Sequence, residues 1–289
     1  MPPALPTAGI RTFVRELARA DLAFAPAPTA TLVPMLVSAT LGHGAQWLQP
    51  AIETGLEALQ QERATSATLA ARRLQLVAHV KEALVKSSVL IGVPRSIELL
   101  VQLGEFLPAD DLRTPFVRSE LEENPAKRLL ATVGENGAAG LGSIYRHNLD
   151  DIFAKFRHNG LEDIRFISQY MTYGLALTPY ASTTSSPASM SSATETPASP
   201  DPFDSDPRLL SVVTLSTLVP QRTAREIHWH LRGALRRGWT RPEVEKLQCA
   251  IERVCEACGA GRDVGKGMPR VADVEPLQPE EENGTSGAQ

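Results

Sequence analysis

The chain has 289 residues, of which 43% are apolar, and a formal net charge of −4. That charge excludes a protein that binds nucleic acid through bulk positive charge, and the length is enough to bury one large core or two modest ones. Aromatic residues make up only 5%, and Ala and Leu dominate the apolar set. This balance favours helices over strands, so we expect an all-α protein.

The N-terminal region carries Arg11, Arg15 and Arg19 at helical spacing, interrupted by Glu16 and Asp21. No apolar signal segment follows, and no apolar run reaches the roughly 18 residues of a membrane span. We therefore expect a soluble protein with no membrane partner. A cytoplasmic location is the main expectation, and a mitochondrial transit peptide within the first residues is the alternative.

The first 180 residues predict helices separated by Gly and Pro. Residues 1–20 are expected to form an N-terminal extension, and residues 21–180 to hold a first helical repeat with its connecting helices. Gly92 and Pro94 separate a predicted helix over about 74–91 from one over about 94–106. Residues 144–180 predict a further helical pair, broken near residue 160.

Two later segments lack the apolar periodicity that packing needs. Residues 181–207 are rich in Ser, Thr, Ala and Pro, and residues 261–289 in Gly, Pro and Glu. We expect the first to be a disordered insertion and the second a disordered tail, neither of them carrying chemistry. Residues 208–260, between them, predict a second helical repeat. Its helices should begin at capping boxes at residues 223–226 and 240–243 and end at Gly238 and Gly259.

Segments 31–59 and 211–238 share their apolar rhythm and spacing, which predicts two stacked copies of a helical hairpin around one core. Segment 225–247, REIHWHLRGALRRGWTRPEVEKL, resembles a family signature in which a helix ends in H-x-R-x-A and is followed by N-G-V-T and E-E-I. Segment 79–107, HVKEALVKSSVLIGVPRSIELLVQLGEFL, resembles the segment REALLxAAxYxGxPxALxAL of that family. The family is the carboxymuconolactone decarboxylase and alkylhydroperoxidase D superfamily. The resemblance implies a helical bundle built from two pseudo-repeats, assembled as a homo-oligomer, with pockets between helices or subunits.

The redox branch of that superfamily uses a Glu, a C-x-x-C pair and a His. Carried over from His230, its pattern requires cysteines at positions 223 and 226 and a Glu at 211, where Thr223, Glu226 and Ser211 stand. Peroxide reduction needs a thiolate and a resolving thiol, so peroxidase activity by the usual route is not expected. The decarboxylase branch also lacks the C-x-x-C, which leaves lyase chemistry open.

His230 is the main catalytic candidate, at the edge of its helix's apolar stripe, where an imidazole can act as acid or base near neutral pH. Glu226 and Glu82 complete the candidate catalytic set. The alternatives are a hydrogen-bonded core histidine for His230 and a solvent-facing i,i+4 pair with Lys86 for Glu82. His228 and His230 point apart on a helix, so no metal site is expected there, and no cofactor is expected.

Arg225, Arg232 and Trp229 are the candidate substrate-binding residues. With Arg236 they form a cationic strip around an exposed indole on one helix face. Such a face can hold a substrate carboxylate or an oligomer partner. The alternative is a solvated face in which arginine stems pack over the ring.

Cys255 and Cys258 form a C-x-x-C and are the redox candidates. Glu243 stands twelve residues before Cys255, but Arg262 occupies the place of the family's His. Both sulfurs fall on an apolar stripe near Cys249, so packing as small hydrophobic side chains is the simpler interpretation. The three cysteines form neither a disulfide framework nor a complete zinc site.

Three functions follow as hypotheses. The first is a lyase or isomerase acting on a small carboxylated or lactone substrate, with His230 as acid or base. The second is a catalytically degenerate, oligomeric binding or scaffold protein. The third is a thiol-dependent oxidoreductase that uses Cys255 and Cys258.

Overall fold

The computed structural model describes residues 5–61, 65–118, 129–178, 201–261 and 263–276. Regular secondary structure in these ranges is helical, without strands, as the composition predicts. None of the helices in the described ranges is both long and apolar enough to cross a membrane.

The N-terminal half contains α1 (Thr7–Glu16), a π-helix η1 (Leu17–Asp21), α2 (Thr29–Thr40), α3 (Gly44–Gln60), α4 (Ser66–Ile91) and α5 (Val93–Phe106). The middle of the chain contains α7 (Leu129–Tyr145), α8 (Asn148–His158), α9 (Glu162–Phe166) and a second π-helix, η2 (Ile167–Leu177). The C-terminal part contains α10 (Arg208–Gln221), α11 (Ala224–Arg236), α12 (Arg241–Ala257) and a short 3-10 helix, η3 (Val271–Asp273).

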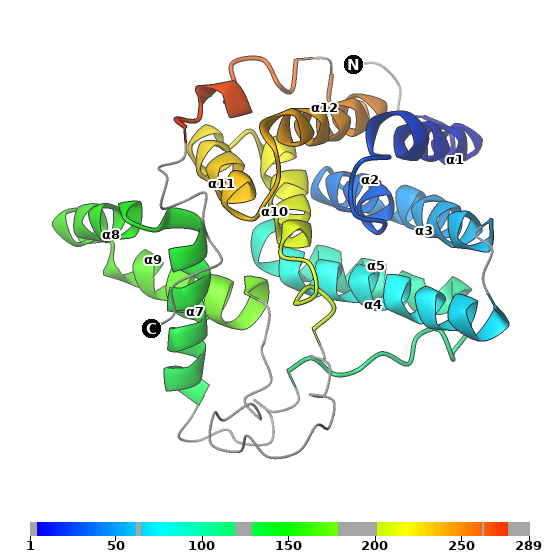
Figure 1. Ribbon diagram of the computed structural model, residues 1–289, viewed down its shortest axis with the longest axis horizontal. Helices are drawn as coiled ribbons and strands as arrows, with labels where there is room; N and C mark the ends of the chain where they lie inside the picture. Colours follow the sequence, from blue (N-terminus) through cyan, green and yellow to red (C-terminus); the bar gives the residue numbers. More distant parts are fainter. Residues whose placement is uncertain (1–4, 62–64, 119–128, 179–200, 262, 277–289) are drawn as a thin grey trace.

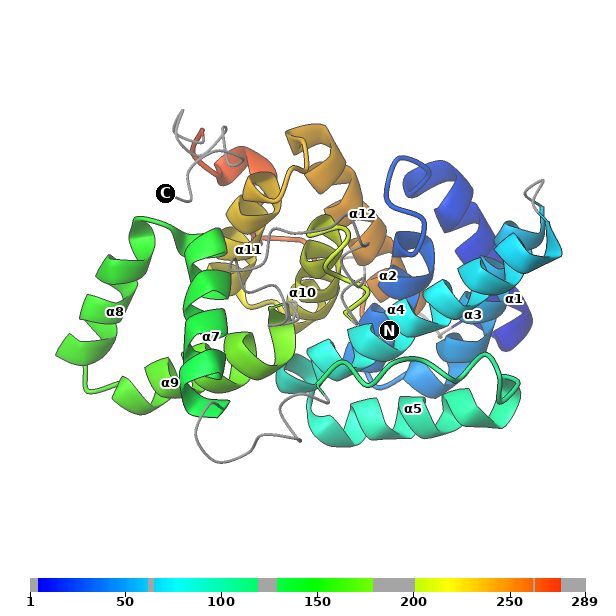
Figure 2. The same cartoon turned by 60° about the horizontal axis from the view of Figure 1, so that its bottom comes forward.

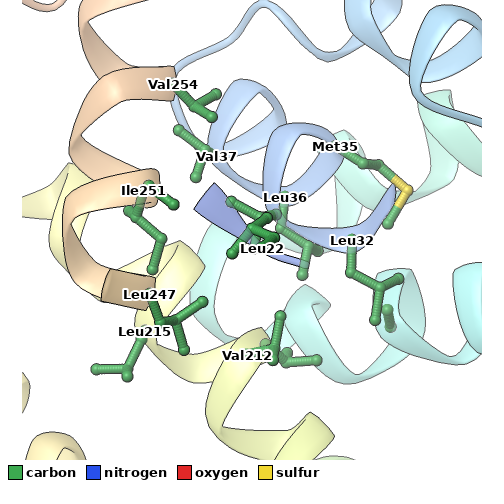
Figure 3. Packing of buried hydrophobic residues seen from close by; sticks show 14 of the residues in the cluster. Leu22, Leu32, Met35, Leu36, Val37, Val212, Leu215, Leu247, Ile251 and Val254 are labelled. Carbon is green, nitrogen blue, oxygen red and sulfur yellow. The ribbon is translucent and has the colours of Figure 1, made fainter. Parts of the chain in front are cut away.

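Helices α2 and α10 form the centre of the bundle. They pack against each other, and both contact α4 and α12 (Figure 1). Nearly all their residues are buried, as expected for helices without a polar face. Figure 3 shows Leu36 of α2, Leu215 of α10 and Ile251 of α12 in this packing. The core is therefore built from elements far apart in the sequence.

The two predicted hairpins coincide with observed pairs of helices. Helix α3 starts at Gly44 and α11 at Ala224, the same place in each of the two compared segments. Each hairpin's first helix, α2 or α10, is a central helix. The two-repeat interpretation and the superfamily fold stay predictions.

The N-terminal extension and the tail belong to the packed fold as far as they are described. Ile10 and Leu17 lie in the main core, and so do Val264 and Val274. Arg241 donates to the carbonyls of residues 271, 274 and 275. The expectation of a disordered tail is thus wrong for residues 263–276, because a few valines and one guanidinium suffice to dock an irregular segment. Residues 277–289 lie outside the described part.

The prediction of a disordered insertion over residues 181–207 is wrong at its C-terminal end. Residues 179–200 lie outside the described ranges, but Asp201 is 2% exposed and Phe203 is fully buried. The backbone N–H of Phe203 donates to the Asp201 carboxylate at 2.9 Å. Asp201 and Phe203 are therefore part of the buried interior, although Asp204, Ser205 and Pro207 beside them are exposed.

Helix boundaries follow the sequence signals in most places. The capping box at Thr240 and Glu243 is present, and α4 and α5 meet at Gly92, although α4 starts earlier than expected, at Ser66. The predicted box at Thr223 is wrong: its hydroxyl donates back to the Leu218 carbonyl at 3.4 Å and caps nothing. The pair predicted in residues 144–180 is present as α8 and α9–η2, on either side of residue 160.

Helices α7 and η2 pack together at backbone distance beside the bundle (Figure 2). A Cβ at Gly137 would lie 1.8 Å from the Gln169 carbonyl oxygen, and one at Gly174 would lie 2.4 Å from that of Val133. With α8, α10 and α11 they enclose a second apolar cluster, separate from the main core. The absence of side chains at these glycines therefore fixes the shape of this smaller unit.

Candidate functional site

A pocket of about 210 Å³ lies between α7, α8, η2 and α11. Its walls are mainly aliphatic and phenyl side chains, among them Leu149, Phe153 and Ile167. Its polar lining includes Tyr145 from α7 and Glu226 from α11. The pocket thus places a carboxyl group and a phenol in largely apolar surroundings.

Glu226 lies in the first turn of α11 and is half-buried. Burial raises the pKa of its carboxyl, and the nearby charge of Arg225 opposes the shift in part. A carboxyl group in such surroundings keeps its proton to higher pH and can serve as a general acid. Glu226 is the one carboxylic residue among the described pocket-lining residues.

Three aromatic side chains connect the pocket to the interior. The rings of Tyr145 and Trp229 meet edge to face with centroids 5.5 Å apart, and those of Tyr145 and Tyr173 do so at 6.4 Å. Burial raises the pKa of Tyr145 well above its usual value and that of Tyr173 to about 12. Both phenols therefore stay protonated and can donate hydrogen bonds.

His230 lies behind these rings and does not line the pocket. It is 4% exposed, and its Nε2 is 3.4 Å from the Tyr173 hydroxyl. Burial, helped by the charge of Arg237, lowers its pKa to about 3, so the imidazole is neutral at physiological pH. The expectation of an imidazole that acts as acid or base near neutral pH does not fit these surroundings, because burial and the charge of Arg237 both disfavour the imidazolium form.

Arg237 is a residue of this cluster that the sequence did not single out. Its Nη1 is buried with no hydrogen-bond partner in the described ranges. Burial lowers its pKa to about 10, and Tyr173 and Tyr145 oppose this shift. In the sequence Arg237 is one of several arginines near the end of its helix. The one sequence feature beside it is Gly238, which predicts the end of the helix, and its φ of 91° agrees with that prediction.

The predicted cationic strip on α11 does not form one continuous solvent-facing surface. Arg232 pairs with Glu275 at 3.2 Å, and Arg236 donates to the Ile144 carbonyl. Trp229 is half-buried against Tyr145, so the expectation of an exposed indole is wrong. Packing of α7 and of the C-terminal segment onto α11 explains this change. Arg225 stays exposed beside the pocket residue Glu226.

Glu82 belongs to a different cluster. Its i,i+4 pair with Lys86 exists at 3.1 Å but is buried, with side chains 5% and 0% exposed, so a solvent-facing pair is wrong. Lys86 Nζ also lies 2.8 Å from Asp201 Oδ2, and Arg118 donates to both Glu82 oxygens. Two cations and two carboxylates thus balance one another. Glu82 does not line the pocket at Glu226.

Cys255 and Cys258 are buried in the main core as free thiols. Burial raises the pKa of Cys255 well above its usual value and that of Cys258 to about 12. Cys249 is half-buried, and burial raises its pKa as well. Within the described ranges, no cluster of three or more His, Cys, Asp or Glu side chains could hold a metal ion.

Comparison with known families finds no matching family model, and neither the curated proteins nor the solved structures contain a match.

Proposed function

We propose that the pocket between α7, η2 and α11 is the active site of a lyase or isomerase acting on a small carboxylated or lactone substrate. The observation that carries the proposal is the Glu226 carboxyl, which combines a raised pKa with a place on an apolar pocket wall beside Tyr145. Groups with such shifted pKa values cluster at catalytic sites.

In this proposal Glu226 moves the proton. As a carboxylate it takes a proton from the carbon next to the lactone carbonyl, and as a carboxylic acid it returns the proton at another carbon, so that the double bond shifts. Tyr145 donates a hydrogen bond to the carbonyl oxygen, where negative charge develops. Arg225, exposed beside Glu226, binds the substrate carboxylate.

His230 has a positioning role in this scheme. Its Nε2 faces the Tyr173 hydroxyl, and Tyr173 packs against Tyr145, which lines the pocket. The proposed acid is therefore Glu226, and His230 acts through the two phenols.

The test is to incubate the protein with a panel of unsaturated carboxylated lactones and to monitor turnover by the absorbance of the conjugated product. Glu226→Gln should lower kcat by about 10²–10⁴-fold. Tyr145→Phe should lower it less, and the exposed control Glu98→Gln should leave it unchanged. An active panel member that Glu226→Gln still converts at the normal rate would exclude the proposal.

A binding protein without turnover is the second candidate, supported by the position of His230 away from the pocket. This candidate would be favoured by a lactone that binds the wild type in calorimetry, fails to bind the Trp229→Ala variant and is not converted. Thiol redox chemistry at Cys255 and Cys258 is not proposed, since burial disfavours the thiolate that it needs.

We also propose that the chain forms a homo-oligomer, as the family resemblance implies. Val93, Ile97 and Val101 recur every four residues on α5 and are 55%, 51% and 60% exposed, an apolar stripe that a second copy could cover. Sedimentation should give a multiple of the 31.2 kDa chain mass, and Ile97→Glu should return the monomer.

A further inference from the structure

The apolar side of α8 faces the pocket at Glu226 instead of a core. All of α8 is described, and none of its residues is buried. Its main contacts are with its neighbours α7 and α9, at the edge of the described fold (Figure 2). Amphipathic helices ordinarily bury their apolar side against other elements. In α8 the apolar residues share one helical face, and all of them line the pocket: Leu149, Ile152, Phe153 and Phe156.

A second wall of this pocket also keeps apolar surface open to solvent. Ile164 of α9 and Ile167 of η2 line it and are 48% and 47% exposed. Ser168 and Thr172 add hydroxyl groups, but Glu226 on α11 is the one charged residue among the described lining residues. A ligand that covers apolar surface gains free energy, whereas a charged group placed there loses its hydration without a partner. The end of the pocket at α8 and α9 therefore favours an apolar group.

The size of the pocket limits what can fill this end. At about 210 Å³ it cannot hold a helix, which is roughly 10–12 Å wide with its side chains. A cavity of about 150 Å³ is enough for a benzene ring. Glu226 and Tyr145 line the same pocket, so one small ligand can contact these two residues and the apolar end together.

We propose that the substrate carries a small hydrophobic substituent, an aryl or short alkyl group, which binds between α8 and α9 while the carboxylated lactone ring lies at Glu226. The inference rests on the function proposed for the ring and adds the feature by which the site selects among such lactones. Phe153 and Phe156 on α8 and Ile164 on α9 determine this specificity. Because the substituent covers the apolar face of α8, its binding also protects that helix from local opening.

The experiment compares two inert ligands by calorimetric titration of the full chain. One is a saturated γ-lactone carboxylate, and the other is the same lactone with a phenyl group on the ring. Neither has a double bond to shift, so binding is measured apart from turnover. The phenyl lactone should bind at least about tenfold more tightly, and it alone should slow amide hydrogen exchange in residues 148–158.

Two variants with equally exposed side chains test the location. Ile164 and Met171 are both 48% exposed, but Ile164 lines the pocket and Met171 does not. Ile164→Ala should weaken binding of the phenyl lactone about three- to tenfold and leave the parent lactone unchanged, whereas Met171→Ala should change neither. Phe156→Ala should have the same selective effect as Ile164→Ala. Thermal melts check that each variant is folded.

The outcomes separate this inference from the proposed reaction. If the phenyl lactone binds more tightly but the unsaturated counterparts of both lactones are not converted, the reaction fails and the hydrophobic subsite stands. The inference is overturned if the phenyl lactone does not bind or binds no more tightly than the parent, or if Ile164→Ala and Met171→Ala affect its binding equally. Protection of residues 148–158 that rises with protein concentration in the absence of ligand would assign this face to a second copy and would also overturn it.

Discussion

Two buried polar regions of this molecule, around Lys86 and around His230, differ in how completely their polar atoms are paired. Around Lys86, each charge meets an opposite one: Lys86 contacts Glu82 and Asp201, and Arg118 contacts Glu82. Around His230, by contrast, buried polar atoms are left over within the described ranges, namely His230 Nδ1 and Arg237 Nη1. The second region lies beside the pocket at Glu226 through its aromatic neighbours.

This difference separates stability from function. In an ion cluster whose charges are all paired, no charged group is available to bind a ligand. Such a cluster stabilises the fold by connecting separate segments of the chain. Unsatisfied buried groups cost stability, and they persist where a reaction or a ligand uses them. The comparison therefore assigns Glu82 to the architecture and Glu226 to the candidate chemistry, although the sequence placed both in one catalytic set.

Breaking the saturated cluster should have the largest effect. Lys86→Met leaves the Asp201 carboxylate buried without its ammonium partner, so the free energy of unfolding should fall by about 3–5 kcal/mol. Urea denaturation at neutral pH measures this change. Adding Asp201→Asn, which keeps an acceptor for the Phe203 N–H, should recover part of the loss. A loss below about 1 kcal/mol in the single variant would contradict the comparison.

The His230 cluster should respond to pH instead. The native pKa of His230, about 3, lies below its unfolded value near 6.5, so the unfolded state takes up a proton that the native state does not. Stability should therefore fall as pH drops from about 6.5 toward 3, with a slope approaching about 1.4 kcal/mol per pH unit from this group. His230→Leu should lack this contribution and should unfold within about 1 kcal/mol of the wild type at pH 7.5. Parallel curves for the two proteins between pH 7.5 and 4 would refute a neutral buried imidazole.

The close packing of α7 on η2 sets the shape of the functional region. Gly137→Ala forces a methyl group against the Gln169 carbonyl, and should cost about 1–3 kcal/mol. Gly142 lies in the same helix with nothing within 4 Å of an added Cβ, so Gly142→Ala should stabilise by up to about 1 kcal/mol. Thermal unfolding of the pair isolates steric contact from helix propensity. Equal shifts would mean that the two helices are not in backbone contact.

The smallest effect is expected at Glu226. Because its folded pKa is raised, the native state is penalised where the unfolded carboxyl is ionised, and the penalty vanishes below the unfolded pKa near 4.3. Glu226→Gln should therefore be slightly more stable than the wild type at pH 7, by less than about 1 kcal/mol, and equal to it below about pH 4. A variant that is less stable at pH 7 would show that the carboxylate is needed by the fold.

Local signals predicted the fold better than the site. The Thr240 box and the stop at Gly92 depend on neighbouring residues and are present. The burial of Lys86 depends on Asp201, 115 positions further along the chain, in a stretch whose composition indicated disorder. Likewise, the helical spacing placed His230 on an apolar edge but could not show that Tyr173 separates it from the pocket. Long-range partners decide what a polar residue does, and spacing along one helix does not contain them.

Lys86 also joins two distant points of the chain. Its ammonium group reaches the Ala176 carbonyl at 3.2 Å and Asp201 at 2.8 Å, on either side of residues 179–200. One ammonium group therefore holds the end of η2 and the segment that leads into α10 at the same place on α4. A change at Lys86 acts on three helices at once, because α4, η2 and the approach to α10 share this single donor.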